Sequence, residues 1–123
     1  MTEAPDAGAP VLAVVRDLFF VARIRETARL AGTPLVFARS LDELSAALPA
    51  GARFILLDLT STFDYTRIFE ALDSAPARPP VLGFTTHALA RETQPWHGRC
   101  DRVVTKETLT QELPALMQGG IAA

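Results

Sequence analysis

One acidic side chain stands out because of the residues around it. Asp58 is the single charged residue in an otherwise apolar run, residues 54–59 (FILLDL). A short, continuous apolar run is typical of a strand that is buried on both faces of a parallel sheet. In open α/β sheets, ligands bind at the carboxyl ends of the strands, where Asp58 would lie. Asp58 is therefore a candidate site residue, and the competing interpretation is that it caps a turn or the next helix.

Further polar side chains lie at the ends of other apolar runs. They are Arg16 and Asp17 after residues 11–15 (VLAVV), Thr85, Thr86 and His87 at the end of residues 80–85 (PVLGFT), and Lys106 after residues 102–105 (RVVT). If these runs are neighbouring parallel strands, their carboxyl ends meet at one edge and the side chains surround one crevice.

A small enzyme that uses Asp58 and His87 as an acid–base pair is one interpretation of this crevice. Against it, a histidine at the start of a short helix is more often exposed or a cap. The chain also has no G-x-S-x-G elbow, glycine-rich phosphate loop or dinucleotide fingerprint. We therefore expect no enzymatic activity.

The hydrophobic pattern predicts the elements that position these side chains. Five segments of helical character alternate with five mainly apolar runs. The apolar runs, which are the predicted strands, are residues 11–15, 34–38, 54–59, 80–85 and 102–105. Asp17 is suited to cap the first helix, Gly32 to end it, and Ser40 to begin a capping box at the second. The alternation predicts a flavodoxin-like α/β fold, in which helices cover both faces of a doubly wound parallel sheet of strand order 2-1-3-4-5.

Prolines limit the last two predicted helices. Pro95 lacks the backbone N–H that would continue the fourth helix, which is predicted over residues 88–94. Pro114 predicts a late start or a kink in the fifth helix.

Composition places the chain among compact globular domains. It has 123 residues, of which 49% are hydrophobic, and a formal net charge of −2. We expect one domain over residues 10–118, a flexible tail at 1–9 and a frayed end at 119–123. The sequence has no basic stripe of the kind that binds nucleic acid, so we expect no nucleic-acid partner. It also has no apolar run long enough to span a membrane, so we expect no membrane span. A single cysteine and the lack of a signal-peptide pattern favour the cytoplasm.

The polar residues at the strand ends resemble those of a response-regulator receiver domain of the chemotaxis-regulator type, over about residues 10–118. In that family an aspartate at the end of strand three accepts a phosphoryl group, and Asp58 in LLDL matches it. A threonine or serine at the end of strand four matches Thr85 in GFTT, with Thr86 beside it. A lysine at the end of strand five matches Lys106 in VVTK. The resemblance implies a signalling module that acts on another signalling protein.

The chain departs from the family after the first strand. Receivers carry two adjacent acids there that hold Mg²⁺, whereas the aligned residues are Val15 and Arg16, and Asp17 lies one place late. Mg²⁺ needs oxygen ligands, which valine and arginine do not supply. We therefore expect Arg16, Lys106 or both to pair with Asp58, in a pseudo-receiver that binds no cofactor and works through protein–protein interaction. The alternative is a working receiver in which Asp17 and Asp58 form a poor Mg²⁺ site.

The resemblance also implies a partner surface, formed by the fourth helix, strand five and the fifth helix, through which receivers dock outputs and often form homodimers. Trp96 and His87 fall on that side, and tryptophan is enriched at binding hot spots. The competing interpretation is that Trp96 covers the core. Phe19 is a second candidate, because the first helix opens with more apolar residues than one buried stripe requires.

Overall fold

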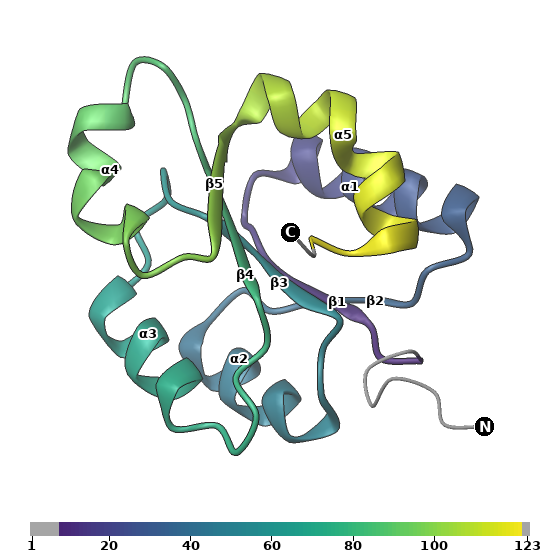
Figure 1. The fold of residues 1–123 in the computed structure, drawn as a ribbon, viewed down its shortest axis with the longest axis horizontal. Coiled ribbons are helices and arrows are strands. Elements are labelled where there is room, and N and C mark those ends of the chain that lie inside the picture. Colours follow the sequence, from purple (N-terminus) through teal and green to yellow (C-terminus); the bar gives the residue numbers. More distant parts are fainter. Residues whose placement is uncertain (1–7, 122–123) are drawn as a thin grey trace.

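The computed structural model describes residues 8–121. Five strands alternate with five α-helices and one short 3-10 helix (Figure 1). The elements are β1 (Val11–Val14), α1 (Leu18–Ala31), β2 (Leu35–Phe37), α2 (Leu41–Ala47), η1 (Leu48–Ala50), β3 (Phe54–Asp58), α3 (Tyr65–Asp73), β4 (Val81–Thr85), α4 (Ala90–His97), β5 (Arg102–Thr105) and α5 (Lys106–Gly119).

The strands form one parallel sheet of order β2-β1-β3-β4-β5, which confirms the predicted flavodoxin-like topology. Helices α1 and α5 cover one face of the sheet, and α2, α3 and α4 cover the other (Figure 1). The central strand β3 is buried along its whole length, as its continuous apolar sequence predicts.

Alternate side chains of β3 enter the two separate halves of the core. Phe54 and Leu56 pack in the cluster under α1 and α5, whereas Ile55 and Leu57 pack in the cluster under α2 and α3. This period of two is the geometry of a strand, and it places Asp58 at the end of a segment that packing fixes on both faces.

The predicted helix ends are present at α1 and α2. The carboxylate of Asp17 accepts hydrogen bonds from the backbone N–H groups of Phe19 (2.9 Å) and Phe20 (3.2 Å). Gly32 ends α1 in the left-handed conformation, with φ of 68°. Ser40 caps α2 by accepting a hydrogen bond from Glu43 N at 3.1 Å.

Two expectations at prolines are wrong: the end of the fourth helix before Pro95 and the late start of the fifth helix. Helix α4 continues through Pro95 to His97, and α5 begins at Lys106 rather than late, with Pro114 inside it. An internal proline costs a helix about 3 kcal/mol in isolation. Packing after each proline offsets that cost, because Trp96 lies against Phe69 and the end of α5 is buried in the core.

The predicted domain limits can be compared with the structure only in part. Most of the predicted tail, residues 1–7, and the last two residues, 122–123, lie outside the described residues. Pro10 O accepts a hydrogen bond from Arg53 N at 2.8 Å, so the described chain is attached to the sheet from there. Ile121 packs against the core under α1 and α5, beyond the predicted limit at residue 118. Over residues 8–121, no helix combines the length and the hydrophobicity that crossing a membrane requires.

Candidate functional site

The strand order brings the candidate polar residues to one edge of the sheet. Strands β1, β3, β4 and β5 are neighbours and run in the same direction. Their carboxyl ends therefore deliver Asp17, Asp58, Thr85 and Lys106 to the same side of the molecule. Which of these side chains contact one another is decided by the loops and helix starts that follow the strands.

Asp58 is held by the loop that follows its own strand. Its side chain is buried, and one carboxylate oxygen, Oδ1, accepts hydrogen bonds from Thr60 N (2.8 Å) and Thr60 Oγ1 (2.6 Å). The other oxygen, Oδ2, accepts no hydrogen bond from the described residues. The carboxylate thus combines the turn-capping role with one oxygen that stays free for a ligand.

Tyr65, at the start of α3, fixes the same loop. Its hydroxyl donates a hydrogen bond to Asp58 O at 2.6 Å and accepts one from Ser61 N at 3.1 Å. Burial raises the pKa of Tyr65, so its hydroxyl keeps the proton that it donates. The Tyr65 hydroxyl therefore bridges the backbone of Asp58 and the backbone of Ser61, across the turn that holds the carboxylate.

Arg16 does not pair with Asp58, contrary to the expectation from the sequence. Its guanidinium lies over the ring of Phe63, 4.2 Å from the ring centroid, and donates hydrogen bonds to Arg39 O (3.2 Å) and Thr62 Oγ1 (3.1 Å). A planar, weakly hydrated guanidinium gains from stacking and from two fixed acceptors at once. Arg16 therefore ties the loops after β1, β2 and β3 together on the side of the crevice nearer β2.

Lys106 does not pair with Asp58 either. Its ammonium forms an ion pair with Asp17 at 3.1 Å and lies 4.8 Å from the centroid of the Phe20 ring. No lysine or arginine among the described residues lies within salt-bridge distance of Asp58, so the predicted charge-paired pocket is wrong. Lys106 begins α5 and Asp17 caps α1, and these two helices pack side by side, which brings the ammonium to Asp17.

Both oxygens of Asp17 are engaged. Oδ1 accepts the two N–H groups at the start of α1, and Oδ2 accepts Lys106 Nζ. The hydrogen bond from Lys106, and then that from Phe20 N, lowers the pKa of Asp17 below its usual value. A metal ion at Asp17 would compete with the ammonium of Lys106 for Oδ2. Within residues 8–121, no three histidine, cysteine or acidic side chains are grouped closely enough to hold a metal ion.

Thr85 is turned toward α4. Its buried hydroxyl is 3.0 Å from Thr93 Oγ1, which in turn lies 2.8 Å from His97 Nε2. Sequence reasoning gave Thr93 no role, and it left His97 outside the fourth helix because it ended that helix before Pro95. Once α4 is extended, the two residues share the i, i+4 spacing that puts them on one helix face.

The residues proposed for a partner surface differ in exposure. Phe19 is 92% exposed, and His87 is exposed in the turn between β4 and α4. Trp96 is half-buried, and its ring stacks on Phe69 with centroids 6.0 Å apart and lies 5.6 Å from Tyr65. Trp96 therefore covers the core, in line with the competing interpretation of that residue.

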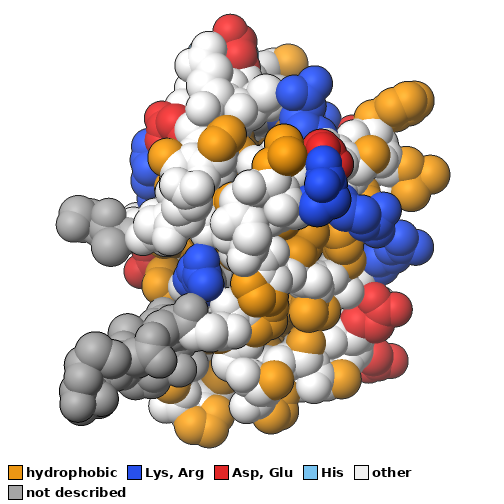
Figure 2. Space-filling view, turned by 90° about the vertical axis from the view of Figure 1, so that its right-hand side faces the viewer, with side chains coloured by type: hydrophobic (Ala, Val, Ile, Leu, Met, Phe, Trp, Pro, Cys, Tyr) orange, Lys and Arg blue, Asp and Glu red, His pale blue; other side chains and the backbone are white. Residues whose placement is uncertain are grey.

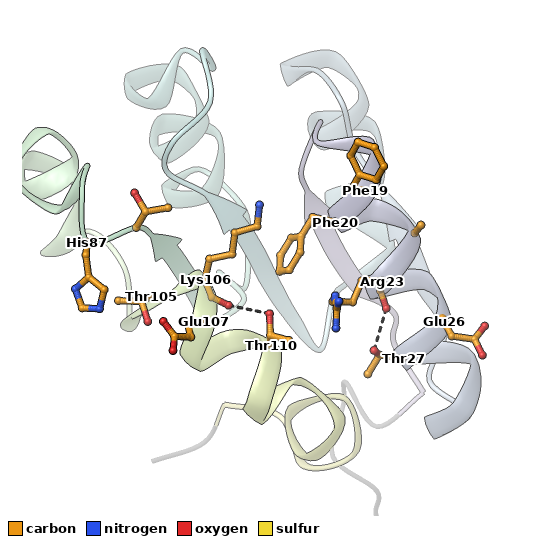
Figure 3. Close-up of a pocket in the computed structure, with 12 residues that line it drawn as sticks. Phe19, Phe20, Arg23, Glu26, Thr27, His87, Thr105, Lys106, Glu107 and Thr110 are labelled. Atoms are coloured by element: carbon orange, nitrogen blue, oxygen red, sulfur yellow. Dashed lines mark hydrogen bonds between the residues drawn. The ribbon is translucent and has the colours of Figure 1, made fainter.

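An open groove of about 940 Å³ lies between the first turns of α1 and α5 (Figure 3). Phe19, Phe20 and Arg23 line it from α1, and Lys106 and Glu107 line it from α5, with His87 at its end. On the side of the molecule where α1, α5 and β2 lie, hydrophobic side chains project from the surface next to Lys and Arg (Figure 2). Asp58 does not line this groove, so His87 and Asp58 belong to different parts of the sheet edge.

The only thiol of the described residues, Cys100, is a packing group. Its sulfur lies where a side chain on Gly83 would stand, 2.9 Å from an ideal Cβ there. Burial raises the pKa of Cys100 to about 11, so the thiol stays protonated near neutral pH. A glycine at position 83 is what lets Cys100 pack this close to β4.

Comparison with solved structures identifies the class of fold. A response-regulator receiver domain from Rhodospirillum rubrum matches with 19% identity and a TM-score of 0.63, covering 89% of this chain and 91% of that chain. The N-terminal domain of a response-regulator receiver protein from Methanoculleus marisnigri JR1 matches with 23% identity and a TM-score of 0.59, covering 94% and 98%. The chain therefore has the fold of receiver domains. No protein-family model and no curated protein matches it.

Proposed function

We propose that this chain is a pseudo-receiver: a signalling module that acts by binding another protein and does not accept a phosphoryl group by the usual Mg²⁺-dependent route. The observation that carries the proposal is the ion pair between Lys106 and Asp17. In a working receiver, an acid after β1 would hold the metal and the lysine would contact the phosphoryl group. Here the nearest acid and the lysine neutralise each other.

The rest of the crevice supports the same conclusion. Mg²⁺ requires a nearly octahedral set of oxygen ligands, and it must offset the charge of the incoming phosphate. Val15 packs in the core, and Arg16 is fixed over Phe63. The hydroxyl of Thr85 is engaged with α4. Of Asp17 and Asp58, only Asp58 has a carboxylate oxygen that no described residue engages.

One observation favours the alternative of a working receiver. Asp58 Oδ2 accepts no hydrogen bond from the described residues, as a phosphoacceptor oxygen requires. Phosphorylation would then need Asp17 to leave Lys106 and share a metal with Asp58, and both side chains of the ion pair are about 40% exposed, so this change is small.

A titration with Mg²⁺ and beryllofluoride separates these two functions. The amide spectrum of the chain should show no saturable shifts at Thr60, Thr85 or Lys106, while a receiver domain with two acids after β1 shows them under the same conditions. Saturable shifts that disappear in Asp58→Asn would overturn the proposal. Incubation with acetyl phosphate and intact-mass measurement gives an independent readout, in which a mass increase lost in Asp58→Asn contradicts it.

For the partner, we propose another signalling protein that docks on the groove between α1 and α5. Phe19 presents a fully accessible ring beside the groove, with Leu18 exposed next to it. Aromatic side chains at the centre of an interface carry much of the binding energy. A homodimer formed through a different face, made by α4, β5 and α5, is a second possibility for the partner. Measurement of the mass in solution by light scattering tests it.

A further inference from the structure

A chain of three hydrogen-bonding side chains joins the end of β4 to the last turn of α4. Thr85 and Thr93 are almost completely buried, and their oxygens are 3.0 Å apart. His97 Nε2 lies 2.8 Å from Thr93 Oγ1. The two threonines are uncharged and buried, whereas His97, at the other end of the path, is half-buried.

Each threonine hydroxyl has one proton, so the direction of donation along the path is set at His97. The proton of Thr93 has three acceptors in reach: His97 Nε2 at 2.8 Å, Thr85 Oγ1 at 3.0 Å and Ala90 O at 3.3 Å. The 2.8 Å contact fits a hydroxyl that donates to an unprotonated Nε2 and also an Nε2–H that donates to the hydroxyl, so the tautomer of His97 decides its direction. In neutral His97 with Nε2 unprotonated, Thr93 therefore donates to His97, and Thr85 donates to Thr93.

We propose that protonation of His97 reverses this path and thereby alters the turn between β4 and α4. One proton from solvent adds to Nε2, which then donates to Thr93 Oγ1. Thr93 in turn donates to Thr85 Oγ1, and the Thr85 hydroxyl keeps its proton and rotates to donate to its next acceptor, Thr86 O, 3.5 Å away. No bond other than hydrogen bonds and the new N–H changes.

The turn that responds is part of the surface described above. Thr86 and His87 line the groove between α1 and α5. The His97 ring itself is not in the groove; it is hydrogen-bonded to Thr93, on the side of α4 that faces the sheet. Histidine is the side chain whose charge ordinarily changes between pH 5 and 8. The path would thus make the groove respond to pH, and this inference does not depend on whether Asp58 is phosphorylated.

The other titratable groups near α4 are either bonded to other residues or exposed. On α3, the Tyr65 hydroxyl is bonded to Asp58 O, Asp73 is paired with Arg78 and Arg99, and β4 has no titratable side chain. After α4, Cys100 donates to Trp96 O, and Asp101 accepts Val81 N. On α4 itself, Arg91 and Glu92 are exposed. None of these groups hydrogen-bonds to the imidazole ring of His97.

Nitrogen and amide NMR of the full chain between pH 5 and 8.5 tests the proposal. At high pH, the ring nitrogen spectrum should show His97 Nε2 unprotonated. On acidification, the Thr85 and Thr86 amides should shift with the midpoint of the His97 ring. In Thr93→Val, His97 should still titrate, while the shifts at Thr85 and Thr86 fall to less than a third of their size.

Two further variants keep the test decisive. Thr93→Ser retains the hydroxyl and should restore the linked titration, and His87→Gln should leave it intact, because His87 lies outside the path. The proposal is overturned if Nε2 carries the proton at high pH, if Thr85 and Thr86 do not follow His97, or if they follow it equally well in Thr93→Val.

Discussion

The two sides of the strand-end crevice are held by different physics. On the α1 and α5 side, Asp17 and Lys106 form a charged pair that is open to water. On the α4 side, Thr85 and Thr93 form an uncharged contact that is buried. Exposed ion pairs contribute about 0–1 kcal/mol, whereas a buried polar group that loses its partner costs about 1–3 kcal/mol. The α4 side should therefore be the stiffer one, and the α1 side should be free to change partners.

The largest effect expected from this comparison is at Thr93. Thr93→Ala removes the hydroxyl between Thr85 and His97 and leaves a small cavity, so the free energy of unfolding should fall by about 2 kcal/mol. Urea unfolding measures it. The matched control is Thr27→Ala on α1, where a less buried hydroxyl donates to Arg23 O and the loss should stay below about 0.7 kcal/mol. Equal losses in the two variants would contradict a stiffer α4 side.

The next effect concerns the loop between the two sides. Tyr65→Phe removes the hydrogen bonds to Asp58 O and from Ser61 N but keeps the ring. The unfolding free energy should drop by about 1–1.5 kcal/mol. Amide hydrogen exchange at Ser61 should also accelerate, whereas exchange in β1 should follow global stability alone. An unchanged rate at Ser61 would show that the loop is held without Tyr65.

The charged side should give a smaller effect with a distinct pH dependence. Lys106→Met keeps most of the aliphatic stem and should cost about 0.5 kcal/mol near pH 7 in low salt, and less in 0.5 M NaCl. The pKa of Asp17 is lowered in the folded state, so its contribution is present above the ordinary carboxyl pKa and is lost as the pH falls through the lowered value. Wild type should therefore lose more stability than Lys106→Met between pH 5 and pH 2. Parallel curves would show that the ion pair contributes nothing.

The fold could be predicted from the sequence because most of the strands are short apolar runs and the first two helices have recognisable end signals. The five strands and their order follow from that alternation, and the burial of β3 follows from FILLDL. The positions of Asp58, Thr85 and Lys106 at one sheet edge follow from the same pattern. Local sequence and connection rules were sufficient for these features.

The partners of the site residues could not be predicted in the same way. Lys106 is long enough to reach more than one acid, and the choice of Asp17 depends on how α5 packs against α1. Arg16 was expected to decide the chemistry by pairing with Asp58, but the ring of Phe63 and two loop oxygens hold it elsewhere. The rule that proline ends a helix left His97 outside the fourth helix, so its pairing with Thr93 one turn earlier was missed, and packing of Trp96 overrides that rule.

The smallest effect on stability, and the sharpest on function, is expected at Phe19. The residue is 92% exposed, so Phe19→Ser should change the unfolding free energy by less than about 0.5 kcal/mol. Leu30 is the matched control, because it lies on the same helix and is 72% exposed but does not line the groove.

A photo-crosslinking amino acid at position 19, introduced in the native host cell, should capture a defined protein that the same probe at position 30 does not. Capture should be reduced several-fold by Lys106→Met if the groove beside Phe19 is the docking site, because Lys106 lines the groove and its loss frees Asp17 to change partners. Equal capture at the two positions would mean that the open, charged side of the crevice is ordinary surface, and the proposed partner would then have to be sought on the α4 side.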